Sequence, residues 1–205
     1  MPIGITFKET MAGAFALGEA SPQAGEERGK AQGLTLAMHA RVEIPDLDAF
    51  IADPDHCGKL SGTVDFSPLG IGLTASQGVF NLFQPSDDPK LKYMVYELGF
   101  SHDGHPLYLA GKKHVRDDAG FDMWSDTTTL LTHLHEGENA QGDVIGAGVL
   151  RLNGGALASL MSTIRVIGTD NPLEQAGAVA KFGQFFMGEL WDSYAPRFGQ
   201  RENAD

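Results

Sequence analysis

Apolar and polar residues alternate with a period of two along much of the chain before residue 153. The clearest stretch covers residues 34–44, and its alternate positions are Leu34, Leu36, Met38, Ala40, Val42 and Ile44. A period of two puts one set of side chains on each face of a β-strand, which predicts one buried face and one solvated face here. The same alternation predicts strands over residues 3–15, 59–66, 76–83, 92–100, 107–115, 127–136 and 143–152.

Turn signals separate these predicted strands. Asp103-Gly104 lies between the segments 92–100 and 107–115, and an Asp-Gly pair between alternating runs is the strongest short-range signal for a β-hairpin. These two segments are therefore predicted to pair antiparallel. The spacing of the strands as a whole is typical of a meander.

Other segments have helical patterns. Asp46 is a good N-cap for a short helix that ends at residue 51. The clearest helix is predicted over residues 171–194, where Asn171 can cap the first turn and Pro172 takes the first helical position. Its apolar stripe is expected to be core rather than a ligand-binding surface, and it contains Val179, Phe182, Phe186, Leu190 and Tyr194. Residues 156–164 are also helix-like, although residues 164–167 fit a strand.

Residues 18–33 show no such pattern. They are rich in Gly, Ala, Glu, Gln and Ser and contain no aromatic residue. This composition predicts a mobile surface loop that is either disordered or a lid over a site, because a long loop is unusual inside a compact domain.

These elements predict one mainly β domain over residues 1–198, followed by a flexible tail over residues 199–205. We expect an antiparallel barrel or strongly curved sheet of about eight strands, lipocalin-like in shape, with the C-terminal helix packed on it. The length of 205 residues is compatible with one such domain.

Composition and charge narrow the possible partners and compartment. The net charge of −12 repels phosphate backbones, so nucleic acid is not an expected partner. Cys57 is the only cysteine and the N-terminus lacks a basic stretch followed by an apolar run, which predicts a cytoplasmic protein. No segment approaches the roughly 20 apolar residues that a membrane span needs.

No motif identifies a cofactor. Residues 70–75 match the G-x-G-x-x-A form of the dinucleotide fingerprint, but a predicted strand follows them instead of the helix that would receive a pyrophosphate. A Gly-x-Ser-x-Gly elbow and a phosphate-cradling Gly-Lys-Ser/Thr loop are both absent from the sequence. We therefore predict no cofactor.

Charged residues crowd into the stretch from Lys112 to Leu131, between two predicted strands. Such a stretch is either a turn whose charges pair with one another or the polar lining of a site. If it is a site, His114 with Asp117 or Asp126 forms the candidate catalytic set, because a carboxylate can orient a histidine that titrates near neutrality. This hypothesis requires His114 and a carboxylate to converge inside a pocket.

If the sheet closes into a barrel, the side chains on one face of each strand line its interior. Met94, Tyr96, Leu98 and Phe100 share one face of their predicted strand, opposite Glu97, and they are the candidate ligand-binding residues together with Trp124 in the charged stretch. His133 and His135 point to one side of another strand, as metal ligands can. No paired cysteines assist them, and a solvated strand face explains them equally well, so we predict no metal.

Several motifs together resemble an accessory domain found with bacterial glucose-methanol-choline flavoprotein oxidoreductases of the cholesterol-oxidase-like kind. They are Phe7-x-Glu9-x-Met11-x-Gly13, Gly78-Val79-Phe80-Asn81-Leu82-Phe83, Met94-Val95-Tyr96-Glu97, Gly111-Lys112-Lys113-x-Val115-x-Asp117-Asp118, Phe121-Asp122-x-Trp124-x-Asp126-Thr127-Thr128-Thr129-Leu130 and Phe185-Phe186-x-x-x-Leu190-Trp191-x-x-Tyr194. The resemblance implies a domain that handles a sterol-like or lipid-like molecule beside a redox enzyme. The flavin-binding half is absent from the sequence, so no oxidase activity or catalytic residue is carried over.

The leading hypothesis is a small-molecule binding protein with a hydrophobic ligand inside or at the mouth of a barrel. One alternative is a cofactor-free isomerase, cyclase or hydratase that uses His114 with an aspartate. Another is an interaction module that docks on a flavoprotein through the C-terminal helix or residues 18–33. A barrel interior completely filled with side chains would count against the first hypothesis.

Overall fold

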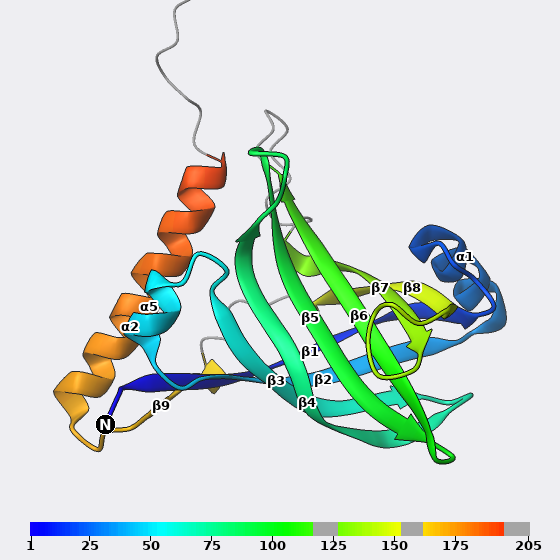
Figure 1. The fold of residues 1–205 in the computed structure, drawn as a ribbon, viewed down its shortest axis with the longest axis horizontal. Helices are drawn as coiled ribbons and strands as arrows, with labels where there is room; N and C mark the ends of the chain where they lie inside the picture. Colours follow the sequence, from blue (N-terminus) through cyan, green and yellow to red (C-terminus); the bar gives the residue numbers. More distant parts are fainter. Residues whose placement is uncertain (117–126, 153–161, 195–205) are drawn as a thin grey trace, which may run out of the picture.

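A closed antiparallel β-barrel forms the centre of the molecule (Figure 1). The computed structural model describes residues 1–116, 127–152 and 162–194. Its barrel strands are β1 (Gly4–Leu17), β2 (Thr35–Ile44), β3 (Cys57–Phe66), β4 (Gly70–Pro85), β5 (Leu91–His102), β6 (His105–Arg116), β7 (Thr129–Glu136) and β8 (Val144–Leu152). Neighbouring strands pair in chain order, and β1 closes the ring by pairing with both β2 and β8. The prediction of a mainly β, eight-stranded antiparallel fold is confirmed.

A further short strand and three helices complete the described ranges. The strand β9 (Arg165–Ile167) pairs with the first residues of β1, as the strand interpretation of residues 164–167 predicted. The helices are α1 (Pro22–Gln32), α2 (Leu47–Ala52) and α5 (Pro172–Tyr194). None of these helices combines the length and apolar character that crossing a lipid bilayer requires. The predicted helix over residues 156–164 falls mostly outside the described residues, as does the predicted tail over residues 199–205.

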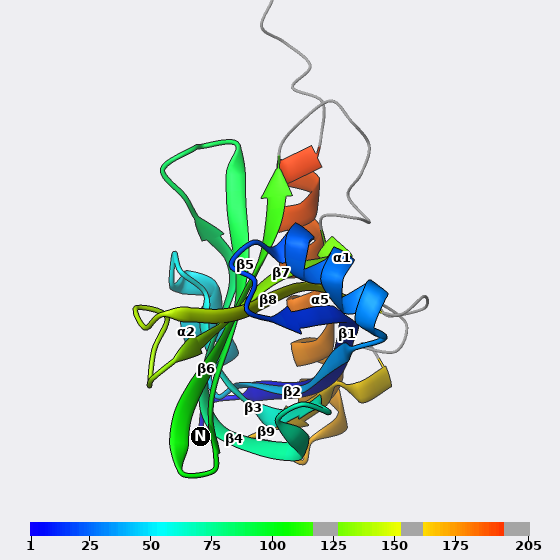
Figure 2. The ribbon, with the colours of Figure 1, turned by 90° about the vertical axis from the view of Figure 1, so that its right-hand side faces the viewer.

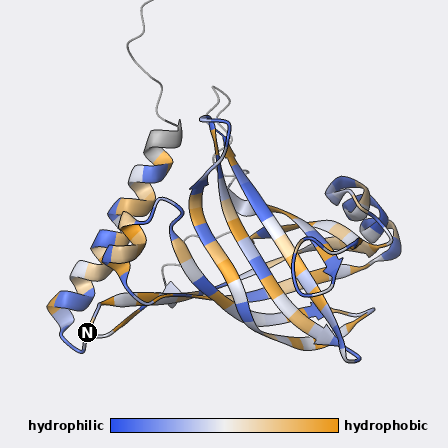
Figure 3. Ribbon diagram, viewed as in Figure 1, coloured by the Kyte–Doolittle hydropathy of each residue, from blue (hydrophilic) through white to orange (hydrophobic). Residues whose placement is uncertain are grey.

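Apolar and polar residues alternate along the strands, so the barrel has an apolar interior and a polar exterior. Figure 3 shows hydrophobic and hydrophilic positions following one another along β5 and β6. Inward-facing side chains form one continuous core; for example, Phe15 and Phe66 meet edge to face at 5.3 Å between ring centroids. Burying this apolar surface is the main force that closes the sheet on itself.

Two local predictions in the strands have clear outcomes. The turn between β5 and β6 contains Asp103 and Gly104 with φ of 50° and 80°, which gives the left-handed pair of a tight two-residue hairpin. The G-x-G-x-x-A sequence lies at the start of β4, which runs antiparallel to β3 and has no helix after it. The reason for setting aside dinucleotide binding is therefore confirmed.

The prediction of a mobile loop over residues 18–33 is wrong, because Pro22–Gln32 forms the helix α1. Gly25 and Gly29 are its buried residues, and they face the outer side of the barrel wall. A Cβ atom at Gly25 would lie 1.9 Å from the carbonyl oxygen of Ala147, and one at Gly29 would lie 2.4 Å from the backbone nitrogen of Phe15. The helix thus packs by close backbone contact, which leaves no apolar stripe to recognise in the sequence.

Helices α2 and α5 lie together at one end of the barrel (Figure 1). Figure 2 looks along the barrel from the other end, with α1 near the viewer and α5 behind the ring of strands. The aromatic stripe of α5 makes the contacts: Phe182 packs against Phe7 of β1 at 5.9 Å, and Phe185 packs against Phe50 of α2 at 5.8 Å. The prediction that this stripe belongs to the core is confirmed for Val179, Phe182, Phe186 and Leu190, whereas the side chain of Tyr194 is outside the described part of the structure.

The short helix α2 depends on its N-cap. The Asp46 carboxylate accepts hydrogen bonds from the backbone N–H groups of Asp48 and Ala49, at 3.1 and 3.0 Å. Replacing this residue (Asp46→Ala) is expected to lower the free energy of unfolding by about 1 kcal/mol, since two backbone donors lose their acceptor. Chemical denaturation measures the loss. The control is Asp87→Ala in the exposed connection between β4 and β5, and equal effects of the two substitutions would contradict the capping role.

Candidate functional site

Two charged residues of opposite sign face the interior of the barrel. Glu9 of β1 lies between the inward-facing Phe7 and Met11, and Lys113 of β6 lies between Gly111 and Val115. Only 7% of Glu9 and 2% of Lys113 is exposed to solvent. Charged side chains are almost never buried to this extent unless they are paired, so these two residues are the outstanding feature of the interior.

Tyr96 of β5 joins the two charges into a cluster, which we call the Glu9–Lys113–Tyr96 cluster. The Lys113 ammonium donates a hydrogen bond to the Tyr96 hydroxyl at 3.3 Å and lies 4.7 Å from the centre of its ring. The distance between Lys113 Nζ and Glu9 Oε2 is 3.8 Å, which is an ion pair but too long for a hydrogen bond. Neither carboxylate oxygen of Glu9 has a hydrogen-bond partner within the described parts of the chain.

Burial and the neighbouring charge shift the pKa values in this cluster. Burial raises the pKa of Tyr96 well above its ordinary value, and the nearby Glu9 carboxylate raises it further. The Tyr96 hydroxyl therefore keeps its proton. Burial also lowers the pKa of Lys113, because desolvation disfavours the ammonium, while the Glu9 carboxylate acts in the opposite direction.

The Glu9–Lys113–Tyr96 cluster lies toward the barrel end that α2 and α5 cover. Aromatic rings connect it to α5, since Tyr96 meets Phe80 at 5.2 Å, Phe80 meets Phe7 at 6.0 Å, and Phe7 packs on Phe182. Apolar material thus surrounds a small polar group. This combination is typical of small-molecule sites, in which a few polar groups fix the orientation of a ligand within an apolar lining.

The barrel wall beside Glu9 has two distinctive features. Glu9 pairs with Ala40 of β2, Ala40 pairs with Gly62 of β3, and Gly62 pairs with Ala75 of β4, so the row of wall residues next to Glu9 is small. On the other side, β1 pairs with β8 from Met11 onward and with β9 up to Thr6. Within the described residues, positions 7–10 of β1 therefore have no strand partner on that side.

Of the predicted ligand-binding residues, Met94, Tyr96, Leu98 and Phe100 are all buried and belong to the core cluster. Tyr96 belongs to the Glu9–Lys113–Tyr96 cluster and Met94 pairs directly with Lys113 across the strands. Leu98 and Phe100 lie nearer the opposite end, where β5 turns into β6. Trp124 lies outside the described residues.

The predicted catalytic set is not brought together inside the barrel. His114 is exposed on the outer face of β6, where its ring meets that of Tyr93 at 5.2 Å. Asp117 and Asp126 lie outside the described residues. The placement of His114 does not meet the requirement of the enzyme hypothesis that this residue line an interior pocket, because its neighbour Lys113 takes the inward position.

Two groups of possible metal ligands lie on the outside of the barrel. The rings of His133 and His135 are 6.2 Å apart on β7, and the Nδ1 atom of His135 is hydrogen-bonded to the Gly142 carbonyl at 2.9 Å. Burial lowers the pKa of His133, and His135 beside it adds to this effect. The positions of both histidine side chains are therefore accounted for by contacts within β7 and the turn that follows it.

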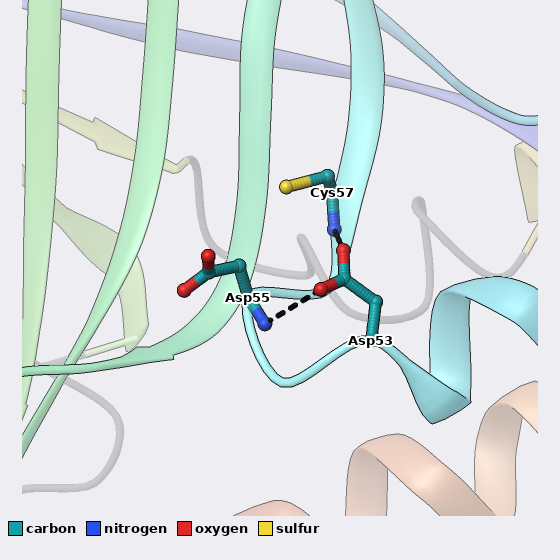
Figure 4. Close-up of side chains that lie close together, drawn as sticks. All are labelled: Asp53, Asp55 and Cys57. Atoms are coloured by element: carbon teal, nitrogen blue, oxygen red, sulfur yellow. Dashed lines mark hydrogen bonds between the residues drawn. The ribbon is translucent and has the colours of Figure 1, made fainter.

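The second group lies between α2 and β3, where ligand atoms of Asp53, Asp55 and Cys57 are within 4.8 Å of one another (Figure 4). The Asp53 carboxylate accepts the backbone N–H groups of Cys57 at 2.9 Å and Asp55 at 3.1 Å. These hydrogen bonds hold the pKa of Asp53 below its ordinary value. The group is therefore explained as a turn that Asp53 stabilises.

Glu9 and Lys113 were missed as site residues in the sequence, although a signal was present. Each occupies a position where the alternating pattern calls for an apolar residue, between Phe7 and Met11 in one case and before Val115 in the other. A charge at an inward position of a predicted strand marks either an error in register or a buried polar group. The sequence pattern does not show that Glu9 and Lys113 meet, because β1 and β6 are not adjacent strands of the barrel.

Comparison with known proteins adds no family to this description. No protein-family model matches the chain, and no curated protein or solved structure matches it significantly.

Proposed function

We propose that this protein binds a small, predominantly hydrophobic molecule in the end of the barrel that α2 and α5 cover. The observation that supports the proposal is the Glu9–Lys113–Tyr96 cluster, in which a buried carboxylate beside an ammonium and a tyrosine hydroxyl receives no hydrogen bond within the described residues. A buried ion pair is a weak source of stability, since desolvating two charges offsets most of their attraction. A role in holding a ligand explains why the interior contains these charges.

The lining supports a ligand that is mostly apolar. Met94, Leu98 and Phe100 share the inward face of β5 with Tyr96, and aliphatic and aromatic side chains from the other strands complete the interior. Among the described residues, the buried charges of the interior are those of Glu9 and Lys113, so a ligand would meet hydrophobic contacts along its length and charged groups at a single point.

A panel of lipids and sterols tests this function. The protein is incubated with each compound and examined by native mass spectrometry, and retention of at least one panel member at one molecule per chain is expected. Isothermal titration calorimetry then gives the dissociation constant. A panel in which every compound fails to bind would overturn the proposal.

Matched variants on β2 locate the binding. Ala40 faces the interior opposite Glu9, whereas Ala37 faces outward on the same strand. The substitution Ala40→Phe is expected to abolish binding by filling the space beside Glu9, and Ala37→Phe is expected to leave it within about twofold. Melting temperatures establish that both variants fold. Equal binding by the two variants would place the ligand somewhere other than the barrel interior.

The resemblance to an accessory domain of flavoprotein oxidoreductases extends the proposal to a biological setting. It implies that the bound molecule is handed to, or received from, a redox enzyme. The test is co-purification with a flavoprotein from the native organism in the presence and absence of the ligand that the panel identifies, with ligand-dependent association as the expected result.

A further inference from the structure

The hydrogen-bonding state of the Glu9–Lys113–Tyr96 cluster restricts the chemistry of a ligand. A carboxylate offers about four acceptor positions and no donor. The two oxygens of Glu9 are buried and receive no hydrogen bond within the described residues, and the nearest ammonium is 3.8 Å away. Leaving a buried charged acceptor unsatisfied is costly, so a ligand that supplies a donor at this point gains more than one that does not.

The ion pair between Lys113 and Glu9 disfavours a charged ligand. Lys113 already has an acceptor in the Tyr96 hydroxyl and a counter-charge in Glu9. An anionic head group would be attracted by Lys113 but repelled by Glu9, and a cationic one attracted by Glu9 but repelled by Lys113, so neither gains an unopposed attraction in an interior where water screens neither charge. A neutral donor is the chemistry that satisfies Glu9 without creating a new unpaired charge.

Small residues form the barrel wall beside Glu9. Ala40, Gly62 and Ala75 form the row of paired positions that begins at Glu9, and Ala40 has the smallest side chain among the inward-facing residues of β2. Bulky neighbours are found on either side of this row, for example Met38 and Val42 on β2. The wall next to the unsatisfied carboxylate is therefore made of small side chains.

We infer that the ligand is an alcohol: an apolar skeleton with a hydroxyl group that donates a hydrogen bond to the Glu9 carboxylate. This inference rests on the proposed function and deepens it. Lys113 acts as a positioning residue whose ammonium lies 3.8 Å from the Glu9 carboxylate, and Tyr96 accepts a hydrogen bond from that ammonium. The corresponding ketone has the same skeleton but no donor, and the corresponding carboxylic acid adds a negative charge beside Glu9.

Matched compounds test the inference directly. A linear ten-carbon chain and a steroid skeleton are each compared as the alcohol, the ketone and the hydrocarbon, with decanoic acid as an anionic member, and affinities are measured by calorimetry. For whichever skeleton binds, the alcohol is expected to bind about tenfold more tightly than the ketone, the ratio that one hydrogen bond to a charged group supplies. Equal affinities for alcohol and ketone, or tightest binding of the acid, would overturn the inference while leaving the proposed function intact. Failure of all compounds to bind would overturn both.

Substitutions assign the preference to Glu9. In Glu9→Gln the amide donates as well as accepts, so the ratio of alcohol to ketone affinity is expected to fall to within about twofold. Because this change leaves Lys113 without its counter-charge, the double variant Glu9→Gln with Lys113→Met provides the same measurement in an interior without charge. The control is Glu43→Gln on the outer face of β2, which should keep the tenfold preference. A preference for the alcohol that persists in both Glu9 variants would overturn the inference.

Discussion

Replacing Lys113 with methionine is expected to lower the free energy of unfolding by about 3–5 kcal/mol, the largest loss that we predict for a single substitution in this protein. Methionine has a similar length and fills the same apolar space, so the substitution removes the ammonium and its hydrogen bond to Tyr96 while keeping the packing. Its removal leaves Glu9 as a buried carboxylate with no counter-charge, because Lys113 is its one ion-pair partner among the described residues. Urea denaturation, with the midpoint and the slope both fitted, measures the loss.

The adjacent residue provides a matched control. Lys112 faces outward on the same strand, and its ammonium lies 5.2 Å from the centre of the Tyr93 ring. The same chemical change there (Lys112→Met) is expected to alter the free energy of unfolding by less than about 1 kcal/mol, since an exposed cation contributes little.

A second substitution separates the charge from the packing. Combining Lys113→Met with Glu9→Gln removes both charges and is expected to restore most of the stability that Lys113→Met loses, because no unpaired charge remains buried. If Lys113→Met costs no more than Lys112→Met, or if the double variant is less stable than Lys113→Met alone, then the two buried groups are not coupled.

Adding one methyl group to α1 is expected to have the second-largest effect. In Gly25→Ala the new Cβ atom would lie 1.9 Å from the carbonyl oxygen of Ala147, and the nearest atoms all belong to the backbone of β8. Rotation of a side chain cannot relieve this overlap, so either the strand or the helix must move. We expect a loss of about 3 kcal/mol in the free energy of unfolding, at the upper end of the usual cost of overpacking. Hydrogen exchange would show reduced protection in α1 and β8.

The same substitution in the C-terminal helix should have the opposite sign. Gly177 of α5 is exposed, and a Cβ atom built on it has nothing within 4 Å. Alanine there replaces a poor helix former with the best one, so Gly177→Ala is expected to stabilise the protein by up to about 1 kcal/mol. If Gly25→Ala were as well tolerated as Gly177→Ala, the close approach of α1 to the barrel would be incorrect.

Local sequence patterns were sufficient for most of the barrel. The segment 34–44 alternates throughout, and the structure has the strand β2 over Thr35–Ile44 with its apolar side inward. Asp103 and Gly104 specify a turn with two left-handed residues, and this turn fixes the register of β5 against β6. In each case the information lies within a few consecutive residues.

Helix α1 was missed for a physical reason. A sequence pattern reveals a helix when the helix buries bulky apolar side chains at regular spacing. The buried residues of α1 are Gly25 and Gly29, which have no side chains to form such a pattern. Glycine is a poor helix former on its own. The two glycines become the buried face of a helix because the backbones of β1 and β8 pack directly against them, and this contact is visible only in the tertiary structure.

The amino-acid sequence by itself determined that the chain forms antiparallel strands, where the main turn lies, and that an aromatic helix near the C-terminus belongs to the core. The tertiary structure decided which of the charged residues meet in the interior. It turned His114 outward and brought Glu9 and Lys113 from two non-adjacent strands to within 3.8 Å inside the barrel. The physical reason is that strand formation depends on neighbouring residues, whereas the meeting of two charges across an interior depends on how the closed sheet is staggered.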